Sequence, residues 1–348
     1  MNNLHFAVVV GINRYPKIGD LHGPVDDAER FAGWLAAPSG GGLPDENIER
    51  RVSSPGGAAV ADDERPTELD VWGAIRSFQE KADEIVAADL GQWEQTRLYL
   101  FVAGHGITPA GGHGALLTAN ASYREPGHHI EVGRYRDFSA VNGHFREVVI
   151  FADCCRRFVH GAVLMPPPFL LRESGRPVRT LVGYGCALGE LAFEGPDGPD
   201  DNPSDRRGYF TDALVRGLET AYDPRFGAVS SHTLQGYVRN DVADRAARNG
   251  RRQSAEILPS ADDILFGPVG DPPARHRLTI RLPGDATGRF ELVDGTFALV
   301  ESWQAGSPTW ATTVPSGLYC VLPEGAVPDR TSIVLGPFTV TGDLDVPA

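Results

Sequence analysis

The sequence predicts an α/β fold in which a mainly parallel sheet is flanked by helices, followed by a small all-β sandwich. Short apolar runs alternate with amphipathic helix patterns over most of the chain, which is typical of a parallel sheet covered on both faces. Two of the runs, Arg97–Gly104 and Glu147–Asp153, lead directly into reactive side chains. Near the C-terminus the helix patterns give way to short runs separated by turn residues, which indicates a second, all-β domain.

The first elements repeat a strand–helix pattern. Phe6–Ile12 is an apolar strand, and Val25–Ala36 is a helix whose apolar residues recur at helical spacing. Ile48–Val52 is a weaker strand. Thr67–Ala88 follows as a long amphipathic helix, for which Thr67 is the expected N-cap. The strand Arg97–Gly104 comes next, so the chain opens with βα units.

The elements after this strand complete the first domain, which closes near Asp263–Phe266. Before the strand Glu147–Asp153 we expect a helix over Phe138–Phe145. After the strand we expect a long Pro-rich loop at Arg156–Arg179, a strand at Arg179–Ala187 and an acidic, turn-rich loop at Gly195–Asp205. Two helices follow, at Tyr209–Leu218 and Thr233–Asn249.

The pattern changes after the Gly/Pro-rich segment Pro268–Pro273. Short apolar or alternating runs follow: Leu278 with Ile280 and Leu282, then Phe290–Val293, Phe297–Val300, Leu318–Leu322 and Phe338–Val340. We therefore expect a first domain over residues 1–268, a linker at 269–274 and a β-sandwich over 275–348.

Composition excludes several classes of function. The 348 residues carry a formal net charge of −14, which argues against binding to a nucleic-acid backbone. The four cysteines show no zinc-ligand spacing and are too few for a disulfide framework in a chain of this length. The N-terminal apolar run has no basic flank and is too short for a signal peptide or membrane span. We expect a cytoplasmic protein without nucleic-acid or membrane partners.

The candidate catalytic residues follow directly after two predicted strands. His105-Gly106 follows the strand Arg97–Gly104, and Cys154-Cys155 follows the strand Glu147–Asp153. Because the carboxyl ends of parallel strands meet at one edge of a sheet, an imidazole and a thiol are expected in one crevice. An ordinary thiol is only a few per cent ionised at neutral pH, and a neighbouring imidazole raises that fraction. The backbone N–H groups of Gly106 and Cys155 are the expected oxyanion donors.

Each of these residues has an alternative interpretation. A histidine between glycines is also typical of a turn, and Gly112-His113-Gly114 repeats the pattern. Cysteine is among the most buried residue types, and side chains alternate along a strand, so only one of Cys154 and Cys155 can face the crevice. We choose Cys155 as the reactive thiol and assign Cys154 to the core.

Five motifs, in order, resemble those of the caspase-like peptidases with the caspase–hemoglobinase fold, in particular bacterial members and metacaspases. These motifs are Gly11-Ile12-Asn13, Asp26-Asp27-Ala28, Ala103-Gly104-His105-Gly106, Asp153-Cys154-Cys155-Arg156 and Gly208–Gly217. The histidine precedes the cysteine by 50 residues, a spacing that is typical of caspases. The resemblance covers roughly residues 4–268 and implies a caspase-like sandwich fold.

The resemblance also implies the roles of individual residues. Cys155 would be the nucleophile and His105 the general base and acid. The metacaspase specificity pocket is acidic, and its carboxylates match Asp27 and Asp153, so a protein or peptide substrate with Arg or Lys before the scissile bond is implied. Ala103 replaces the pocket hydroxyl of metacaspases. Taken alone, Asp27 would equally be an ordinary charge at a helix N-terminus.

No cofactor is expected. Many metacaspases use calcium, but Asn120 stands where the first acidic ligand would be, and Arg156–Leu164 contains no carboxylate. The segment Asp197–Asp205 holds enough carboxylates for a hard cation, although a solvated surface loop is the commoner role.

The sequence also suggests how the activity could be regulated and which other functions compete with it. The loop Arg156–Arg179 either covers the cleft and is cut by the enzyme itself at Arg172, Arg176 or Arg179, or it is a passive crossover. A regulatory protein partner could bind the β-sandwich. The chain is expected to be a regulated bacterial effector in signalling or defence. The alternatives are a catalytically silent scaffold and an Asp-directed peptidase, for which no matching set of arginines is found.

Overall fold

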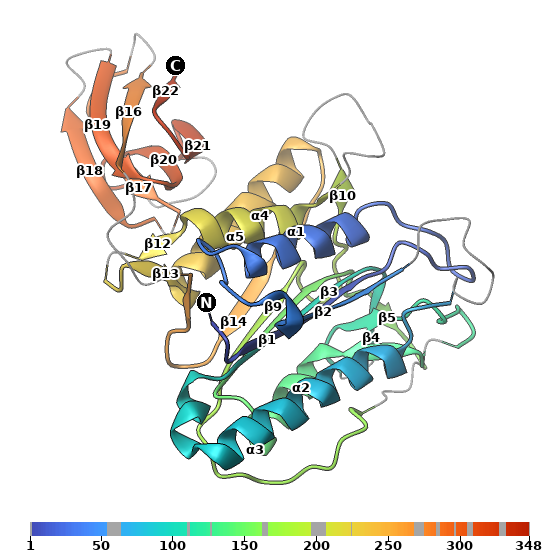
Figure 1. The fold of residues 1–348 in the computed structure, drawn as a ribbon. Helices are drawn as coiled ribbons and strands as arrows, with labels where there is room; N and C mark the ends of the chain where they lie inside the picture. Colours follow the sequence, from blue (N-terminus) through green and yellow to red (C-terminus); the bar gives the residue numbers. More distant parts are fainter. Residues whose placement is uncertain are drawn as a thin grey trace.

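The computed structural model describes residues 2–53, 64–109, 112–125, 127–161, 166–195, 207–223, 225–267, 275–282, 286–295, 297–304, 309–326 and 332–347. The predicted linker at 269–274, and all but the first residue of the predicted acidic loop, lie outside the described residues. Figure 1 shows a central sheet with helices on both faces and an all-β unit near the C-terminus. The predicted fold class is therefore confirmed.

The central sheet has six strands in the order β14-β9-β7-β3-β1-β2. The strands are β1 (His5–Gly11), β2 (Ile48–Val52), β3 (Arg97–Ala103), β7 (Glu147–Asp153), β9 (Arg179–Tyr184) and β14 (Glu256–Pro259). Neighbouring strands are parallel except β14, which runs antiparallel to β9. Gly11, Ala103 and Asp153 are in register, so β1, β3 and β7 end at the same edge. This shared edge positions the site.

Helices cover both faces of the sheet (Figure 1). One face packs against α1 (Pro24–Ala36), α4 (Tyr209–Thr220) and α5 (Ser231–Arg248), and the other against α2 (Glu68–Ala88) and α3 (Val132–Asn142). Thr67 is the N-cap of α2, as predicted, because its hydroxyl accepts from the backbone N–H of Asp70. Two short 3-10 helices, η1 (Asp45–Asn47) and η2 (Leu90–Gln95), precede β2 and β3. No described helix has the length and apolar character that crossing a membrane requires.

The sequence misplaced α3, which was predicted over Phe138–Phe145 but runs from Val132 to Asn142. Gly143 adopts a left-handed conformation with φ 65° and ends the helix, and Phe145 enters the core beyond it. The hydrophobic periodicity was blurred because the helix begins with small and charged residues.

A second small sheet was not predicted. Its order is β6-β5-β4-β8, and its strands are β4 (Gly106–Pro109), β5 (Ala115–Leu117), β6 (His129–Glu131) and β8 (Phe158–Val159). These strands are too short to show a period of two. The sheet matters because β4 begins directly after His105 and β8 follows shortly after Cys155, so it fixes both catalytic candidates from the same side.

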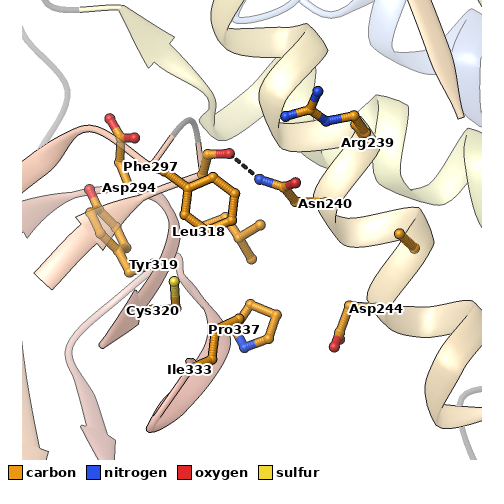
Figure 2. Close-up of a pocket in the computed structure, with 12 residues that line it drawn as sticks. Arg239, Asn240, Asp244, Asp294, Phe297, Leu318, Tyr319, Cys320, Ile333 and Pro337 are labelled. Carbon is orange, nitrogen blue, oxygen red and sulfur yellow. Dashed lines mark hydrogen bonds between the residues drawn. The ribbon is translucent and has the colours of Figure 1, made fainter. Parts of the chain in front are cut away.

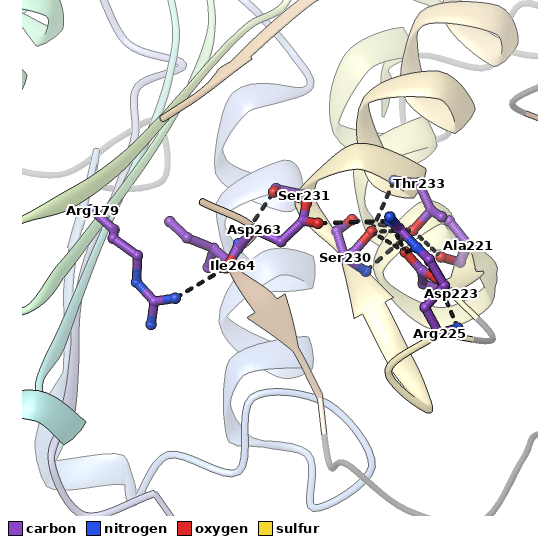
Figure 3. Close-up of polar contacts among 9 residues, drawn as sticks. All are labelled: Arg179, Ala221, Asp223, Arg225, Ser230, Ser231, Thr233, Asp263 and Ile264. Atoms are coloured by element: carbon purple, nitrogen blue, oxygen red, sulfur yellow. Dashed lines mark hydrogen bonds and ion pairs between the residues drawn. The ribbon is translucent and has the colours of Figure 1, made fainter. Parts of the chain in front are cut away.

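The later part of the first domain contains the short strands β10 (Glu194–Gly195), β11 (Arg207–Gly208), β12 (Tyr222–Asp223), β13 (Ala228–Ser230) and β15 (Leu265–Phe266). Figure 3 shows polar contacts of residues in and beside β12, β13 and β15. Asp263 accepts a hydrogen bond from the Ser231 hydroxyl through Oδ1, and its backbone carbonyl accepts one from Arg179. These contacts tie Asp263 to α5 and β9. The expected end of the first domain near this residue stays a prediction.

The C-terminal unit is a sandwich of two sheets, with orders β19-β16-β22 and β18-β17-β20-β21. Its strands are β16 (Arg275–Arg281), β17 (Arg289–Asp294), β18 (Leu299–Gln304), β19 (Thr309–Pro315), β20 (Gly317–Pro323), β21 (Leu335–Val340) and β22 (Leu344–Val346). The predicted inward residues Leu278 and Ile280 are fully buried between the sheets. The threonine-rich strand β19 was not predicted.

The sandwich also packs on α5 (Figure 2). Leu318 of β20 belongs to the core of the first domain, and the Asn240 side chain donates to the carbonyl of Gly295. A pocket of about 270 Å³ lies between α5 and the sandwich, with Phe297 and Pro337 among its lining. The sandwich is thus fixed by side-chain contacts and not only by a tether.

Candidate active site

His105 is positioned by the turn that follows β3. Gly104 has a φ of 154°, and a side chain there would collide with the hydroxyl of Tyr15. That hydroxyl accepts from the backbone N–H of His105 and donates to the carbonyl of Leu117. Nε2 of His105 lies 2.9 Å from the carbonyl oxygen of Gly19. Because a carbonyl can only accept, Nε2 carries the proton and Nδ1 is left as an acceptor.

The two cysteines after β7 have different surroundings. Cys154 is 2% exposed and lies in the core, whereas Cys155 is only partly buried. The Sγ of Cys155 lies 3.7 Å from the carbonyl oxygen of Ala192. Burial raises the pKa of the Cys155 thiol, the contact with Ala192 opposes this shift, and the Asp153 carboxylate raises it further. The resting thiol therefore holds its proton and needs a base to remove it.

One pocket of about 130 Å³ at the sheet edge brings together the predicted dyad and the predicted substrate-binding residues, but Gly106 is not in its lining. It is lined by Leu21, Pro24, Asp27, Ala103, Gly104, His105, Asp153, Cys154, Cys155, Ala192, Phe193, Glu194 and Gly208. Ala103 lies in the wall, as expected. His113 is not among them, because its ring packs against Gly133 and its N–H donates to Glu131. The pocket thus holds His105 but not the alternative histidine.

Gly106, one expected oxyanion donor, lies against the cysteines. A Cβ at this position would collide with the carbonyl of Cys155 and come within 2.7 Å of the Cys154 sulfur. The hydrogen bond from Leu117 N to the His105 carbonyl makes Gly106 and Leu116 a non-hydrogen-bonded pair. The Gly106 N–H therefore points away from β5.

Three carboxylates from three segments converge on the pocket. Asp27 of α1 accepts from the Gly208 N–H through Oδ2, at 2.9 Å, and its Oδ1 is buried without a partner. Oδ2 of Asp153 accepts from both the N–H and the hydroxyl of Thr211, at 3.1 and 2.7 Å. Glu194 of β10 accepts from the Gly23 N–H through Oε2, at 2.9 Å.

Burial and mutual repulsion shift the pKa values of the acid groups in this cluster. Burial raises the pKa of Asp27 well above its ordinary value, and the Asp153 charge adds to the shift. Burial also raises the pKa of Asp153 to about 6; the Thr211 hydrogen bonds oppose this, and Glu194 adds to it. Among the described residues, no Lys or Arg side chain lines the pocket. A cationic ligand would relieve this repulsion.

Gly208 and Glu194 were missed by the sequence reasoning as pocket residues. A side chain at Gly208 would collide with Asp153 Oδ2 and approach Asp27 Oδ2 within 2.8 Å, so the glycine keeps the acid groups accessible. Glu194 begins the short pair β10–β11, and its only signal in the sequence was its place at the start of the acidic loop.

The described residues 166–179 of the loop Arg156–Arg179 do not line the pocket. This segment runs along α2 and α3, where Asn142 donates to the carbonyl of Leu170 and the Ser174 N–H donates to Val141. Phe169 packs on this outer surface, and none of the segment lines the pocket. For its described residues, the alternative of a passive crossover fits.

The three arginines proposed for self-cleavage therefore lie far from Cys155. Arg179 starts β9 opposite Glu147, about 20 Å from the other end of the sheet at a rise of about 3.3 Å per residue. Arg179 is ion-paired with Glu147 and Arg176 donates to the Gly143 carbonyl, whereas Arg172 is exposed. Self-cleavage stays a prediction, and it would have to occur between two molecules.

The expectation about calcium also stays a prediction. The Asn120 amide donates to Glu68, whose other oxygen contacts His128, so this cluster is satisfied internally. In the part of the chain that the structure describes, no group of three or more His, Cys, Asp or Glu side chains could hold a metal ion. Residues Asp197–Asp205 lie outside that part.

The chain is similar to several known proteins. No family model matches the chain. A probable protease from a Desulfuromonadales bacterium is 27% identical over 238 residues, covering 62% of this chain, but the chain spans only about a quarter (26%) of that protein. A crystal structure of caspase-1 from Spodoptera frugiperda aligns with 74% of this chain and 86% of its own, at 12% identity and a TM-score of 0.46. A protein from Geobacter sulfurreducens aligns with 74% of this chain and 93% of its own, at 13% identity and a TM-score of 0.41.

Proposed function

We propose that the chain is a cysteine endopeptidase that cleaves peptide bonds after Arg, and less efficiently after Lys. One observation carries the proposal: a thiol, an imidazole with a defined acceptor nitrogen and three carboxylates without a cation line the same small pocket. A scaffold with no catalytic role would have no need for this combination. Perturbed carboxylates beside a nucleophile in a cleft are typical of functional sites.

In the proposed reaction, Nδ1 of His105 removes the proton from the Cys155 thiol, and the thiolate attacks the substrate carbonyl. The Gly19 carbonyl holds the imidazole in the required tautomer. The N–H groups of Gly106 and Cys155 stabilise the negative oxygen of the tetrahedral intermediate. His105 then returns the proton to the leaving amine, and a water molecule, activated by the same imidazole, hydrolyses the thioester.

The acid groups are proposed to select the residue before the scissile bond. A guanidinium entering the pocket would meet the unpartnered Oδ1 of Asp27, and a charge-assisted hydrogen bond contributes roughly 1.5–3 kcal/mol. A substrate Asp would bring a fourth negative charge to the same place. From the resemblance alone, we further propose that the enzyme is a regulated effector in bacterial signalling or defence, with a protein partner at the sandwich.

The test uses four versions of one fluorogenic peptide, with Arg, Lys, citrulline or Asp before the cleaved bond. Citrulline has nearly the shape of Arg without its charge. We expect kcat/KM to fall in the order Arg, Lys, citrulline, with no cleavage after Asp. Preference for Asp would refute the specificity, and failure to cleave any of the peptides would favour the silent scaffold.

A further inference from the structure

We propose that the pocket between α5 and the sandwich binds a small amphipathic carboxylate, a molecule with an apolar body and one negative group. The proposed function does not use this site, so the inference can be tested whether or not the chain is a peptidase. The pocket shares no lining residue with the pocket at the sheet edge. Figure 2 shows α5 on one side of it and strands of the sandwich on the other.

The pocket is larger than a packing defect. Protein interiors contain few voids larger than a water molecule, and an apolar cavity of about 150 Å³ is enough to bind benzene. This pocket measures about 270 Å³, which suits an aromatic ring with a short chain. Clefts between domains with apolar walls and a few convergent polar groups are typical ligand sites. The size therefore fits a small organic molecule.

The walls on the sandwich side are largely apolar (Figure 2). They include Phe297, Leu318, Ile333 and Pro337. Phe297 and Ile333 are only partly buried, so part of their apolar surface is open to the pocket. The apolar body of a ligand would cover this surface and remove it from water, which is favourable.

The backbone of Phe297 is strained. Among the described residues it is the one residue other than glycine with a positive φ, 64°, a conformation that a bulky side chain disfavours. The turn holds it there, because the Phe297 N–H donates to the Asp294 carbonyl and the Ala298 N–H donates to Asp294 Oδ1. Glycine would satisfy this turn without strain. Residues held in such conformations cluster at functional sites, and here the strain places an aromatic ring in the pocket wall.

The charges at the pocket favour an anion. Asp244 is ion-paired with Arg248, and Asp294 Oδ1 accepts from the Ala298 N–H. Arg239 also lines the pocket, but it is exposed and has no ion-pair partner among the described residues. A guanidinium pairs with a carboxylate through two parallel N–H bonds. Arg239 is therefore the expected anchor for the negative group of the ligand.

The two walls are already joined without a ligand. Leu318 of β20 belongs to the core of the first domain, and the Asn240 side chain of α5 donates to the Gly295 carbonyl. A preformed pocket spares the ligand the cost of ordering the walls. Because the ligand would touch α5 and the sandwich together, its binding should also stabilise the junction between them.

The experiment measures the binding of phenylbutyrate, neutral phenylbutanol and cationic phenylbutylamine, which share one apolar body. Isothermal titration calorimetry with the full chain gives each Kd. Arg239→Gln removes the proposed anchor, and Arg239→Lys keeps its charge. Ala243→Phe fills the pocket from α5, whereas Ala247→Phe places the same ring one turn later, at an exposed position outside the pocket. The thermal unfolding midpoint establishes that each variant is folded.

We expect phenylbutyrate to bind the native protein about tenfold more tightly than phenylbutanol. Arg239→Gln should abolish this difference while changing the Kd of phenylbutanol by less than about twofold, and Arg239→Lys should keep part of it. Ala243→Phe should abolish the binding of both molecules. Ala247→Phe should change neither Kd by more than about twofold.

Three results would overturn the inference. The first is no saturable binding of phenylbutyrate to the native protein up to about 10 mM. The second is phenylbutyrate binding that survives Ala243→Phe, because the molecule would then occupy another site. The third is tighter binding of phenylbutylamine than of phenylbutyrate. Amine binding counts only where Ala243→Phe removes it, since the acid groups at the sheet edge also attract cations.

Discussion

The two ends of the central sheet bury acid groups in opposite ways. At the amino end, Glu147 is 6% exposed and pairs with both Arg97 and Arg179. At the carboxyl end, Asp153 is 8% exposed and Asp27 only 2%, yet no cationic side chain among the described residues shares their pocket. Burial is similar, but among the described residues only the acid at the amino end is ion-paired with arginines. The comparison separates buried acids that are paired within the described chain from those that are not.

A fourth buried acid supports this distinction. Asp212 lies between α1, α4 and α5, and its ion pairs are with Arg30, Arg216 and Arg245. Burial would raise the pKa of Asp212, but the three arginines outweigh it, so the pKa is lower than usual. The pKa of Asp153 is instead raised to about 6. Opposite shifts at similar burial separate a carboxylate that is paired with arginines from one that is not.

The largest expected effect is on catalysis at the carboxyl end. Cys155→Ala removes the nucleophile and should lower kcat for the Arg peptide at least about a thousandfold, whereas Cys154→Ala should retain a substantial fraction of activity. His105→Ala should resemble Cys155→Ala, with His113→Ala as its matched control. Initial rates of peptide cleavage measure all four variants. Activity that survives in Cys155→Ala but not in Cys154→Ala would reverse the assignment of the nucleophile.

The next largest difference should be in the free energy of unfolding, which substitutions at the two ends of the sheet should change differently. Arg97→Met leaves the buried Glu147 with one cation fewer and should lower the free energy of unfolding by about 3 kcal/mol. Asp27→Asn keeps an acceptor for Gly208 and removes an unpaired buried charge, so the free energy of unfolding should stay unchanged or rise. Urea denaturation at neutral pH measures both. Equal destabilisation by the two variants would break the distinction between the ends.

For substrate binding the order should be reversed: substitution of the pocket acids should weaken binding, whereas Arg97→Met should not. Asp27→Asn and Asp153→Asn should each lower kcat/KM for the Arg peptide about 10- to 100-fold, chiefly through KM. The citrulline peptide should be affected much less, because it carries no charge. Arg97→Met, if folded, should leave KM for both peptides near that of the native protein. A loss that is as large for citrulline as for Arg would show that the acids act only on structure.

The smallest expected effect is on pH dependence. Burial, with Glu194 adding to it, raises the pKa of Asp153 to about 6, so lowering the pH through 6 neutralises this carboxylate. KM for the Arg peptide should therefore rise as the pH falls from about 7 to 5, and KM for citrulline should not. Burial and the Asp153 charge also raise the pKa of Asp27, so its protonation would weaken binding of the Arg peptide in the same direction. An effect on the reaction itself would change kcat for both peptides alike. Parallel KM profiles for the two peptides would contradict this expectation.

The sequence predicted the catalytic edge because its signals are local. An apolar run that leads into His105 or Cys155 places the residue at a strand end, and alternation along the strand separates Cys154 from Cys155. Glu194 and Tyr15 could not be predicted in the same way. Their roles depend on contacts with Gly23 and with the turn after β3, which only the folded chain brings together.

The path of the segment 166–179 could not be predicted for a related reason. Proximity to Cys155 in the sequence suggested a lid, but the chain must return to the amino end of the sheet to begin the parallel strand β9. The crossover therefore carries Arg172 and Arg176 away from the pocket. The path of this segment is therefore set by the parallel arrangement of β7 and β9, and not by its closeness to Cys155 in the sequence.

Covalent labelling would show whether the thiol and the acid pocket act as one site. The protein is treated with a peptide acyloxymethyl ketone carrying Arg next to the reactive group, and with matched probes carrying citrulline or Asp. The cysteine thiolate displaces the acyloxy group and forms a thioether, which peptide mass spectrometry locates. We predict one adduct, on Cys155, with the Arg probe reacting fastest and Asp27→Asn slowing that probe alone. An adduct on another cysteine, or faster labelling by the Asp probe, would contradict the proposed enzyme.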